Sequence, residues 1–268
     1  MKHQIGIALS GGGTRGVVHI GVLQALEENG IFPTIISGVS AGSIIGAMYA
    51  HGYSPKEIMT MASERSLIWM FSLRLPTKGF VRHSFLRKML QRYVHEKTFE
   101  ELKFPLYVAI SNLNTGKIEI IDSGPLHEVI VASASIPVLY EPIHIGGHWY
   151  VDGGLLMNLP VSPIRELASY VIAVNLIPRK VLGFDEVNTI AGVASRTFNL
   201  AAINTIEPEL KYCDVLIEPH SIYQYSRFNF TKIKEMYEIG YEEANKMMPQ
   251  IKEDLKALNH DDSKRREA

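Results

Sequence analysis

Cysteine is almost absent from this sequence: Cys213 is the only one among 268 residues, so no disulfide can link two parts of the chain. Cys213 stands in a strand-like run, where we expect a small core residue. An excess of one charge is also missing. The 27 basic and 28 acidic side chains leave a formal net charge of −1, which argues against general affinity for nucleic acids.

Long apolar runs are missing as well. No stretch approaches the roughly 18 apolar residues that a membrane-spanning helix needs. The apolar run 5–9 is too short for the core of a signal peptide. We therefore expect a cytoplasmic protein with a single domain over residues 1–259. The polar and charged segment 260–268 is expected to be a disordered tail.

The apolar segments predict an α/β fold. Strand-like and helical segments alternate, and 46% of the residues are hydrophobic, which suffices for a sizeable core. This alternation predicts a mostly parallel sheet with helices on both faces. The predicted strands are 5–9, 34–37, 106–111, 118–121, 143–145, 149–151, 170–176 and 213–218, and the predicted helices are 17–29, 40–52, a helix starting at 54, 84–95, 125–135, 162–168, 185–206 and 231–248.

A serine lies on a sharp turn between a strand and a helix. The sequence Gly38-Val39-Ser40-Ala41-Gly42 has the Gly-x-Ser-x-Gly spacing of a nucleophile elbow, and a strand precedes it while a helix follows. A side chain at Gly38 or Gly42 would collide with the neighbouring helix or strand. The helix N-terminus behind Ser40 stabilises developing negative charge. Ser40 is therefore a candidate nucleophile.

A glycine-rich loop follows the first strand, and three interpretations compete for it. The sequence Gly11-Gly12-Gly13-Thr14-Arg15-Gly16 fits the spacing of a dinucleotide fingerprint. That interpretation expects a carboxylate at the end of the second strand, where the sequence has Ser37 and Gly38. The favoured interpretation is an oxyanion hole made of backbone N–H groups. A plain turn is the third.

Ser40 needs a base, and histidine is a poor candidate. The α/β-hydrolase order would place a histidine after the acidic residue, but only His220 and His260 follow Asp152, in a loop and in the tail. His144, His148 and Asp152 are four apart, which on a helix would align metal ligands. The glycines between the two histidines indicate a hairpin instead, so we expect no metal site.

Asp152 ends a predicted strand and is followed by Gly153 and Gly154. A turn aspartate is common in such a position, so this residue alone leaves a plain turn open. Its freedom to approach a serine directly favours a role as the base. We then expect Ser40 Oγ to lie within hydrogen-bond distance of the Asp152 carboxylate.

Together the three blocks resemble the patatin-like phospholipase family. The family pattern is a glycine-rich loop near the N-terminus, then Gly-x-Ser-x-Gly, then Asp-Gly-Gly or Asp-Gly-Ala, and the segment 132–137 is also similar to the family. The resemblance covers about residues 5–177. It implies a three-layer α/β/α fold, a Ser40–Asp152 dyad without histidine or cofactor, and an oxyanion hole from the N–H groups of residues 11–15.

The resemblance further implies hydrolysis of fatty acyl esters of phospholipids or lysophospholipids, at a membrane or micelle surface. Arg15 then has two open roles, contact with an anionic head group or pairing with a carboxylate. An acyltransferase on the same dyad, a catalytically silent lipid-binding module and a nucleotide-binding protein remain rivals. The oligomeric state is left open. The apolar segment 66–75 is either core or a flap over the acyl channel.

Overall fold

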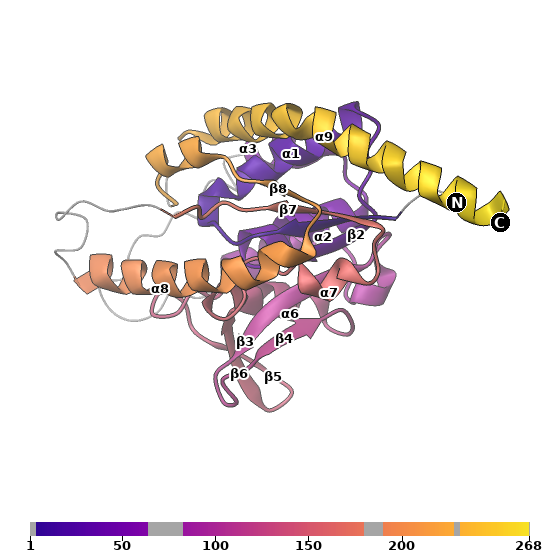
Figure 1. Cartoon of the computed structure of the whole chain (residues 1–268). Coiled ribbons are helices and arrows are strands. Elements are labelled where there is room, and N and C mark those ends of the chain that lie inside the picture. Colours follow the sequence, from indigo (N-terminus) through magenta and orange to yellow (C-terminus); the bar gives the residue numbers. More distant parts are fainter. Residues whose placement is uncertain (1–3, 64–82, 180–189, 228–230, 268) are drawn as a thin grey trace.

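A mixed sheet of eight strands runs through the centre of the molecule, with helices on both faces (Figure 1). The computed structural model describes residues 4–63, 83–179, 190–227 and 231–267. The strands are β1 Ile5–Leu9, β2 Ile35–Gly38, β3 Leu106–Asn112, β4 Ile118–Ile121, β5 Ile143–Ile145, β6 His148–Asp152, β7 Tyr170–Val174 and β8 Val215–Ile217. The helices are α1 Val17–Glu28, α2 Ala41–His51, α3 Pro55–Ser63, α5 Ser84–Tyr93, α6 Leu126–Ser133, α7 Ser162–Arg165, α8 Ile190–Ile206 and α9 Ile233–Glu267.

The strand order is β5-β6-β3-β2-β1-β7-β8, and β4 pairs with β3 outside this path. The neighbours from β3 to β8 are parallel, whereas β4, β5 and β6 form antiparallel pairs. The predicted three-layer α/β fold with a mostly parallel central sheet is therefore confirmed. Because β1 and β2 are parallel neighbours, the loops that follow them meet at one edge of the sheet.

Two separate apolar cores lie on the two faces of the sheet. Successive strand residues point to opposite faces, so Ile7 and Leu9 of β1 join one core while Ala8 joins the other. The larger core packs α1, α2, α3, α6 and α9 on its face, and the smaller packs α7 and α8 on the opposite one. Figure 1 shows α1, α3 and α9 above the sheet and α7 and α8 below it.

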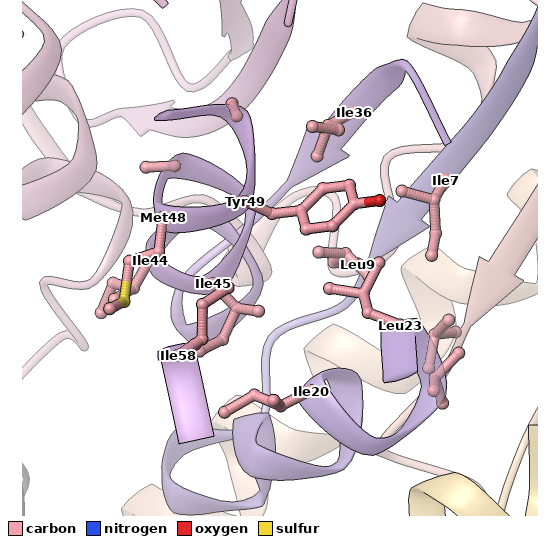
Figure 2. Packing of buried hydrophobic residues seen from close by; sticks show 14 of the residues in the cluster. Ile7, Leu9, Ile20, Leu23, Ile36, Ile44, Ile45, Met48, Tyr49 and Ile58 are labelled. Atoms are coloured by element: carbon pink, nitrogen blue, oxygen red, sulfur yellow. The ribbon is translucent and has the colours of Figure 1, made fainter. Parts of the chain in front are cut away.

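The larger core fixes the helix that carries the candidate nucleophile. Figure 2 shows Ile44, Met48 and Tyr49 of α2 lying among side chains of α1, α3, β1 and β2. The side chains of Ile44 and Met48 are almost fully buried. Burial of each such side chain contributes about 1.5–3 kcal/mol, so α2 has little freedom to move relative to the sheet.

The C-terminal segment differs from its prediction. The sequence predicts a disordered tail over 260–268, whereas the structure continues α9 through Glu267. The physical reason is that adding residues to an existing helix is much easier than nucleating a new one, so α9 continues into the polar residues.

The predicted flap at 66–75 and the first part of the predicted helix 185–206 lie outside the described residues. None of the described helices combines the length and apolar character that a bilayer crossing needs.

The contact between α1 and α9 depends on glycine. A Cβ on Gly21 of α1 would lie 2.1 Å from the carbonyl oxygen of Tyr237, and a Cβ on Gly240 of α9 would lie 2.1 Å from that of Val18. Both obstacles are backbone atoms, which cannot rotate away. The two helix axes are therefore as close as they are because neither residue has a side chain at the crossing.

We expect Gly21→Ala to lower the free energy of unfolding by about 1–3 kcal/mol, because the added methyl forces the two helices apart. Urea unfolding followed by circular dichroism measures this loss. Glu238→Ala, on the exposed side of α9, is the matched control and should change stability by less than about 0.5 kcal/mol. Equal stability of Gly21→Ala and the control would show that the crossing tolerates a side chain.

Candidate active site

Ser40 lies at the turn between β2 and α2 in a strained backbone conformation. Its φ of 53° and ψ of −124° fall in a region that non-glycine residues rarely adopt. This strain is typical of a nucleophile elbow, in which the serine hydroxyl projects at the end of the sheet. Ser40 is also the residue before the first turn of α2, so its hydroxyl lies at the positive end of the helix dipole.

The glycines around Ser40 allow an unusually close approach of backbone to backbone. A Cβ on Gly42 would lie 2.1 Å from the carbonyl oxygen of Leu9, and one on Gly38 would lie 2.6 Å from that of Gly42. The steric reason given for these glycines is therefore confirmed. Because Gly42 has no side chain, α2 begins directly against the end of β1, where the glycine loop starts.

Ser133 fixes the backbone of the elbow through two hydrogen bonds. Its Oγ accepts a hydrogen bond from the N–H of Ser40 at 2.9 Å and donates one to the carbonyl of Ala109 at 2.8 Å. Ser133 is fully buried at the end of α6, and Ala109 lies in β3. This serine therefore ties the strained turn to the neighbouring strand. Sequence reasoning included Ser133 in the segment 132–137 but did not assign it this role.

Asp152 is the last residue of β6, and its carboxylate is buried beside Ser40. The Ser40 side chain lies close enough to lower the pKa of this carboxylate, whose Oδ1 accepts the N–H of Gly154 at 2.8 Å. The backbone is fixed too: Asp152 pairs with Ile110 of β3, and its N–H donates to the carbonyl of Ser135 at 2.9 Å. The structure thus brings together the two residues that the sequence selected.

Burial raises the pKa of Asp152 from 3.8 to about 7. The hydrogen bonds from Ser40 and from the Gly154 N–H act in the opposite direction, as does the positive charge of Arg227, and they limit the rise. An aspartate with this pKa can both accept and release a proton near neutral pH, which is the range that suits a general base.

Two of the predicted oxyanion donors are engaged elsewhere. The N–H of Gly11 donates to the carbonyl of Asn158 at 3.2 Å, and the N–H of Thr14 donates to the carbonyl of Arg227 at 2.9 Å. Arg15 and Gly16 lie inside a short 3-10 helix, Gly13–Gly16, whose N–H groups point back along the chain. Among the described residues, no backbone carbonyl outside that helix accepts from Gly12 or Gly13. The N–H groups of Gly12 and Gly13 therefore remain as the candidate donors of the oxyanion hole.

Arg15 has neither of the two roles left open for it. Its guanidinium is buried and donates to the carbonyl of Tyr225 through Nε at 2.9 Å and Nη2 at 2.7 Å, and to that of Leu176 through Nη1 at 3.4 Å. It also lies over the Tyr223 ring, 5.4 Å from the centroid. Arg15 therefore binds backbone carbonyls of a distant segment, and the sequence offers no signal for such a contact.

Asn158 joins the glycine loop to the Asp-Gly-Gly turn. Its side-chain oxygen occupies the space beside both Gly11 and Gly154, since a Cβ on either glycine would lie 2.6 Å from it. Its backbone carbonyl accepts the N–H of Gly11, and its own N–H donates to Thr205 Oγ1 at 2.9 Å. Its buried amide nitrogen has no hydrogen-bond partner among the described residues. Sequence reasoning missed this residue.

The histidines considered as metal ligands or as the base are not arranged for either role. His144 and His148 lie on the β5–β6 hairpin, as expected, and the ring of His144 packs on Trp149. His220 lies in a surface 3-10 helix with its side chain 75% exposed. Within the described part of the chain, no three His, Cys, Asp or Glu side chains gather in a group that could hold a metal ion.

The family model of the patatin-like phospholipases matches residues 7–164. The chain belongs to the patatin-like phospholipase family. Lysophospholipase NTE1 of Scheffersomyces stipitis is 27% identical over 273 aligned residues, which cover 91% of this chain and 18% of that protein. Lysophospholipase nte1 of Aspergillus fumigatus is 28% identical and covers 92% and 18% respectively. This patatin-like chain thus spans less than a fifth of the length of these curated relatives.

Solved structures share the patatin-like fold at low sequence identity. VipD from Legionella pneumophila matches with a TM-score of 0.53 and 16% identity, over 93% of this chain and 67% of VipD. The ExoU–SpcU complex of Pseudomonas aeruginosa matches with a TM-score of 0.50 and 14% identity, over 93% of this chain and 52% of that chain. At these identities the likeness concerns the fold alone.

Replacing Ser133 tests how the elbow of this patatin-like domain is held. Ser133→Ala leaves the buried N–H of Ser40 without its acceptor, and we expect a loss of about 1–3 kcal/mol in the free energy of unfolding. Ser63→Ala is the control, because Ser63 Oγ is exposed and donates to the carbonyl of Met59 within its own helix. A loss no larger than that of the control would mean that the strained turn does not need Ser133.

Proposed function

We propose that this chain is a serine lipid acyl hydrolase that cleaves fatty acyl esters of phospholipids or lysophospholipids through a Ser40–Asp152 dyad. One observation carries the proposal. A buried aspartate with a pKa of about 7 lies beside a serine in an elbow conformation, and the serine side chain lowers that pKa. Neither feature has a structural purpose of its own, because burying the carboxylate and straining the turn both cost stability.

In the first half-reaction, Asp152 accepts the proton of the Ser40 hydroxyl while Oγ attacks the ester carbonyl carbon. The carbonyl oxygen becomes an oxyanion, which the N–H groups of Gly12 and Gly13 stabilise together with the dipole of α2. The tetrahedral intermediate then collapses. The C–O bond to the leaving alcohol breaks, the alcohol oxygen takes the proton from Asp152, and the acyl group stays on Ser40.

In the second half-reaction, Asp152 accepts a proton from water, and the resulting hydroxide oxygen attacks the acyl carbon. The fatty acid leaves as Ser40 Oγ regains its proton from Asp152. A single group thus serves as base and acid in each half. The pKa of about 7 makes both transfers feasible near neutral pH. An acyltransferase would differ only in the second half, where an alcohol replaces water.

The substrate class is inferred from relatives. The curated relatives carry the name lysophospholipase, and the family is that of patatin-like phospholipases. We therefore propose phospholipid or lysophospholipid esters as substrates, met at a membrane or micelle surface by a cytoplasmic protein. No cofactor or metal enters the proposed steps.

The dyad is tested by three variants. Ser40→Ala should abolish ester hydrolysis and labelling by a fluorophosphonate probe, because the nucleophile is gone. Asp152→Asn should also abolish turnover, since an amide cannot accept the proton. His220→Gln should retain most activity. Release of fatty acid from lysophosphatidylcholine, measured with and without an added alcohol acceptor, separates hydrolysis from acyl transfer.

The control for these variants is folding, checked by melting temperature. A folded His→Gln variant that loses a thousandfold in turnover would contradict the dyad and restore a histidine base. A wild-type chain that binds lipid vesicles but neither reacts with the probe nor cleaves any ester would support the silent lipid-binding alternative.

The pH dependence follows from the raised pKa of Asp152. The base must be ionised, so activity is lost as pH falls below the pKa. For a neutral p-nitrophenyl ester we expect kcat/KM to rise about tenfold per pH unit in the acid limb and to level off above about pH 7. Circular dichroism at each pH excludes unfolding as the cause. A profile that is flat between about pH 5 and about pH 8 would contradict the assignment of Asp152 as base.

A further inference from the structure

A segment near the C-terminal end lies directly against the glycine loop. Thr14 donates twice to this segment, through N–H to the carbonyl of Arg227 at 2.9 Å and through Oγ1 to that of Ser226 at 3.2 Å. Arg15 adds two hydrogen bonds to the carbonyl of Tyr225. The loop and the segment are more than 200 residues apart in sequence. Because the acceptors at 225–227 are backbone carbonyls, these contacts do not depend on which side chains stand at those positions.

The side chain of Arg227 begins beside the candidate oxyanion donors. A Cβ on Gly13 would lie 2.6 Å from the carbonyl oxygen of Arg227 and 3.2 Å from its Cβ. Gly13 also has a φ of +61°, which glycine adopts without strain. The arginine therefore starts within a few ångströms of the loop, and its positive charge acts on the Asp152 carboxylate, whose pKa it lowers.

Positive charge gathers around this arginine. Arg15 and Arg196 both act on Arg227 as like charges, while Asp152 is the carboxylate that acts on it among the described residues. Burial, followed by Arg15, lowers the pKa of Arg227 to about 10, so the guanidinium stays charged at neutral pH. The guanidinium of Arg15 is itself hydrogen-bonded to backbone carbonyls. This half-buried cation thus acts on a carboxylate that is itself about half protonated near pH 7.

We propose that Arg227 binds the phosphate of the substrate head group and so selects phosphate-bearing acyl esters over neutral acylglycerols. This inference rests on the proposed function. In a lysophospholipid the phosphate lies only a few covalent bonds from the scissile ester carbonyl, so an ester held by Gly12 and Gly13 brings its phosphate within reach of a side chain that begins at the same loop. Arginine matches a phosphate with two parallel hydrogen bonds.

The role of Arg15 follows from the same geometry. By holding the carbonyl of Tyr225, it fixes the backbone two residues before Arg227. Arg15 is therefore a positioning residue, and Arg227 contacts the substrate. The buried Arg15 of the loop thus fixes the position of Arg227, and Arg227 of the distant segment binds the phosphate.

The experiment compares two substrates with the same acyl chain, lysophosphatidylcholine and monoacylglycerol, with the wild type, Arg227→Gln and Arg227→Lys. We expect Arg227→Gln to lower kcat/KM for lysophosphatidylcholine about 10- to 100-fold, mainly through KM, as for loss of a charged hydrogen bond. Both substrates are assayed at about pH 9, where Asp152 stays ionised even though loss of the Arg227 charge raises its pKa. The kcat/KM of Arg227→Gln for monoacylglycerol should then change less than about threefold. Arg227→Lys should fall between wild type and Arg227→Gln, because it keeps the charge and loses the planar fork.

The matched control is Arg92→Gln, which removes one exposed arginine from α5 and should leave both substrates unaffected. Equal losses on the two substrates, or no loss on either, would overturn the inference while leaving the hydrolase intact. A wild type that cleaves neither substrate and resists the fluorophosphonate probe would instead overturn the proposed function, and the inference with it. Melting temperatures within a few degrees of the wild type exclude unfolding, since the Arg227 carbonyl remains in each variant.

Discussion

The buried carboxylate of Asp152 is the constraint on which the rest of the site depends. A charged group in a low-dielectric interior is costly unless polar groups surround it; here the N–H of Gly154 donates to it and the Ser40 side chain lies close enough to lower its pKa. Each partner requires its own arrangement of the chain. Position 154 must be occupied by a residue without a side chain, and Ser40 must project from a strained elbow. The parallel neighbours β1 and β2, with β3 and β6 beside them, bring these pieces to one edge of the sheet.

The strain at Ser40 is held by its surroundings. The N–H of Ser40 is fixed by Ser133, α2 is packed into the larger core, and the start of α2 lies against the Leu9 carbonyl. A strained conformation persists only where the surrounding structure determines it from several sides. The same core that stabilises the fold therefore also maintains the geometry of the Ser40 hydroxyl.

Much of the fold and the centre of the site could be predicted from the sequence, because their signals are local. Apolar runs mark the strands, and glycine spacing marks the turns around Ser40 and Asp152. Ser133, Asn158 and Arg227 could not be assigned in this way. Their contacts join segments far apart in the chain, and several go to backbone carbonyls or N–H groups, which every residue type offers. The helix through residues 260–267 was missed because its residues are polar and it is continued from α9.

The hydrogen bonds between the glycine loop and residues 225–227 also bear on the order in which the molecule matures. A ribosome releases all three sequence motifs long before it reaches Arg227. Until then the Thr14 N–H and the Arg15 guanidinium lack the carbonyls that hold them in the finished structure. The nascent chain therefore carries a serine and an aspartate without a completed loop beside them. Translation itself therefore delays the assembly of the candidate site until residues 225–227 have been made.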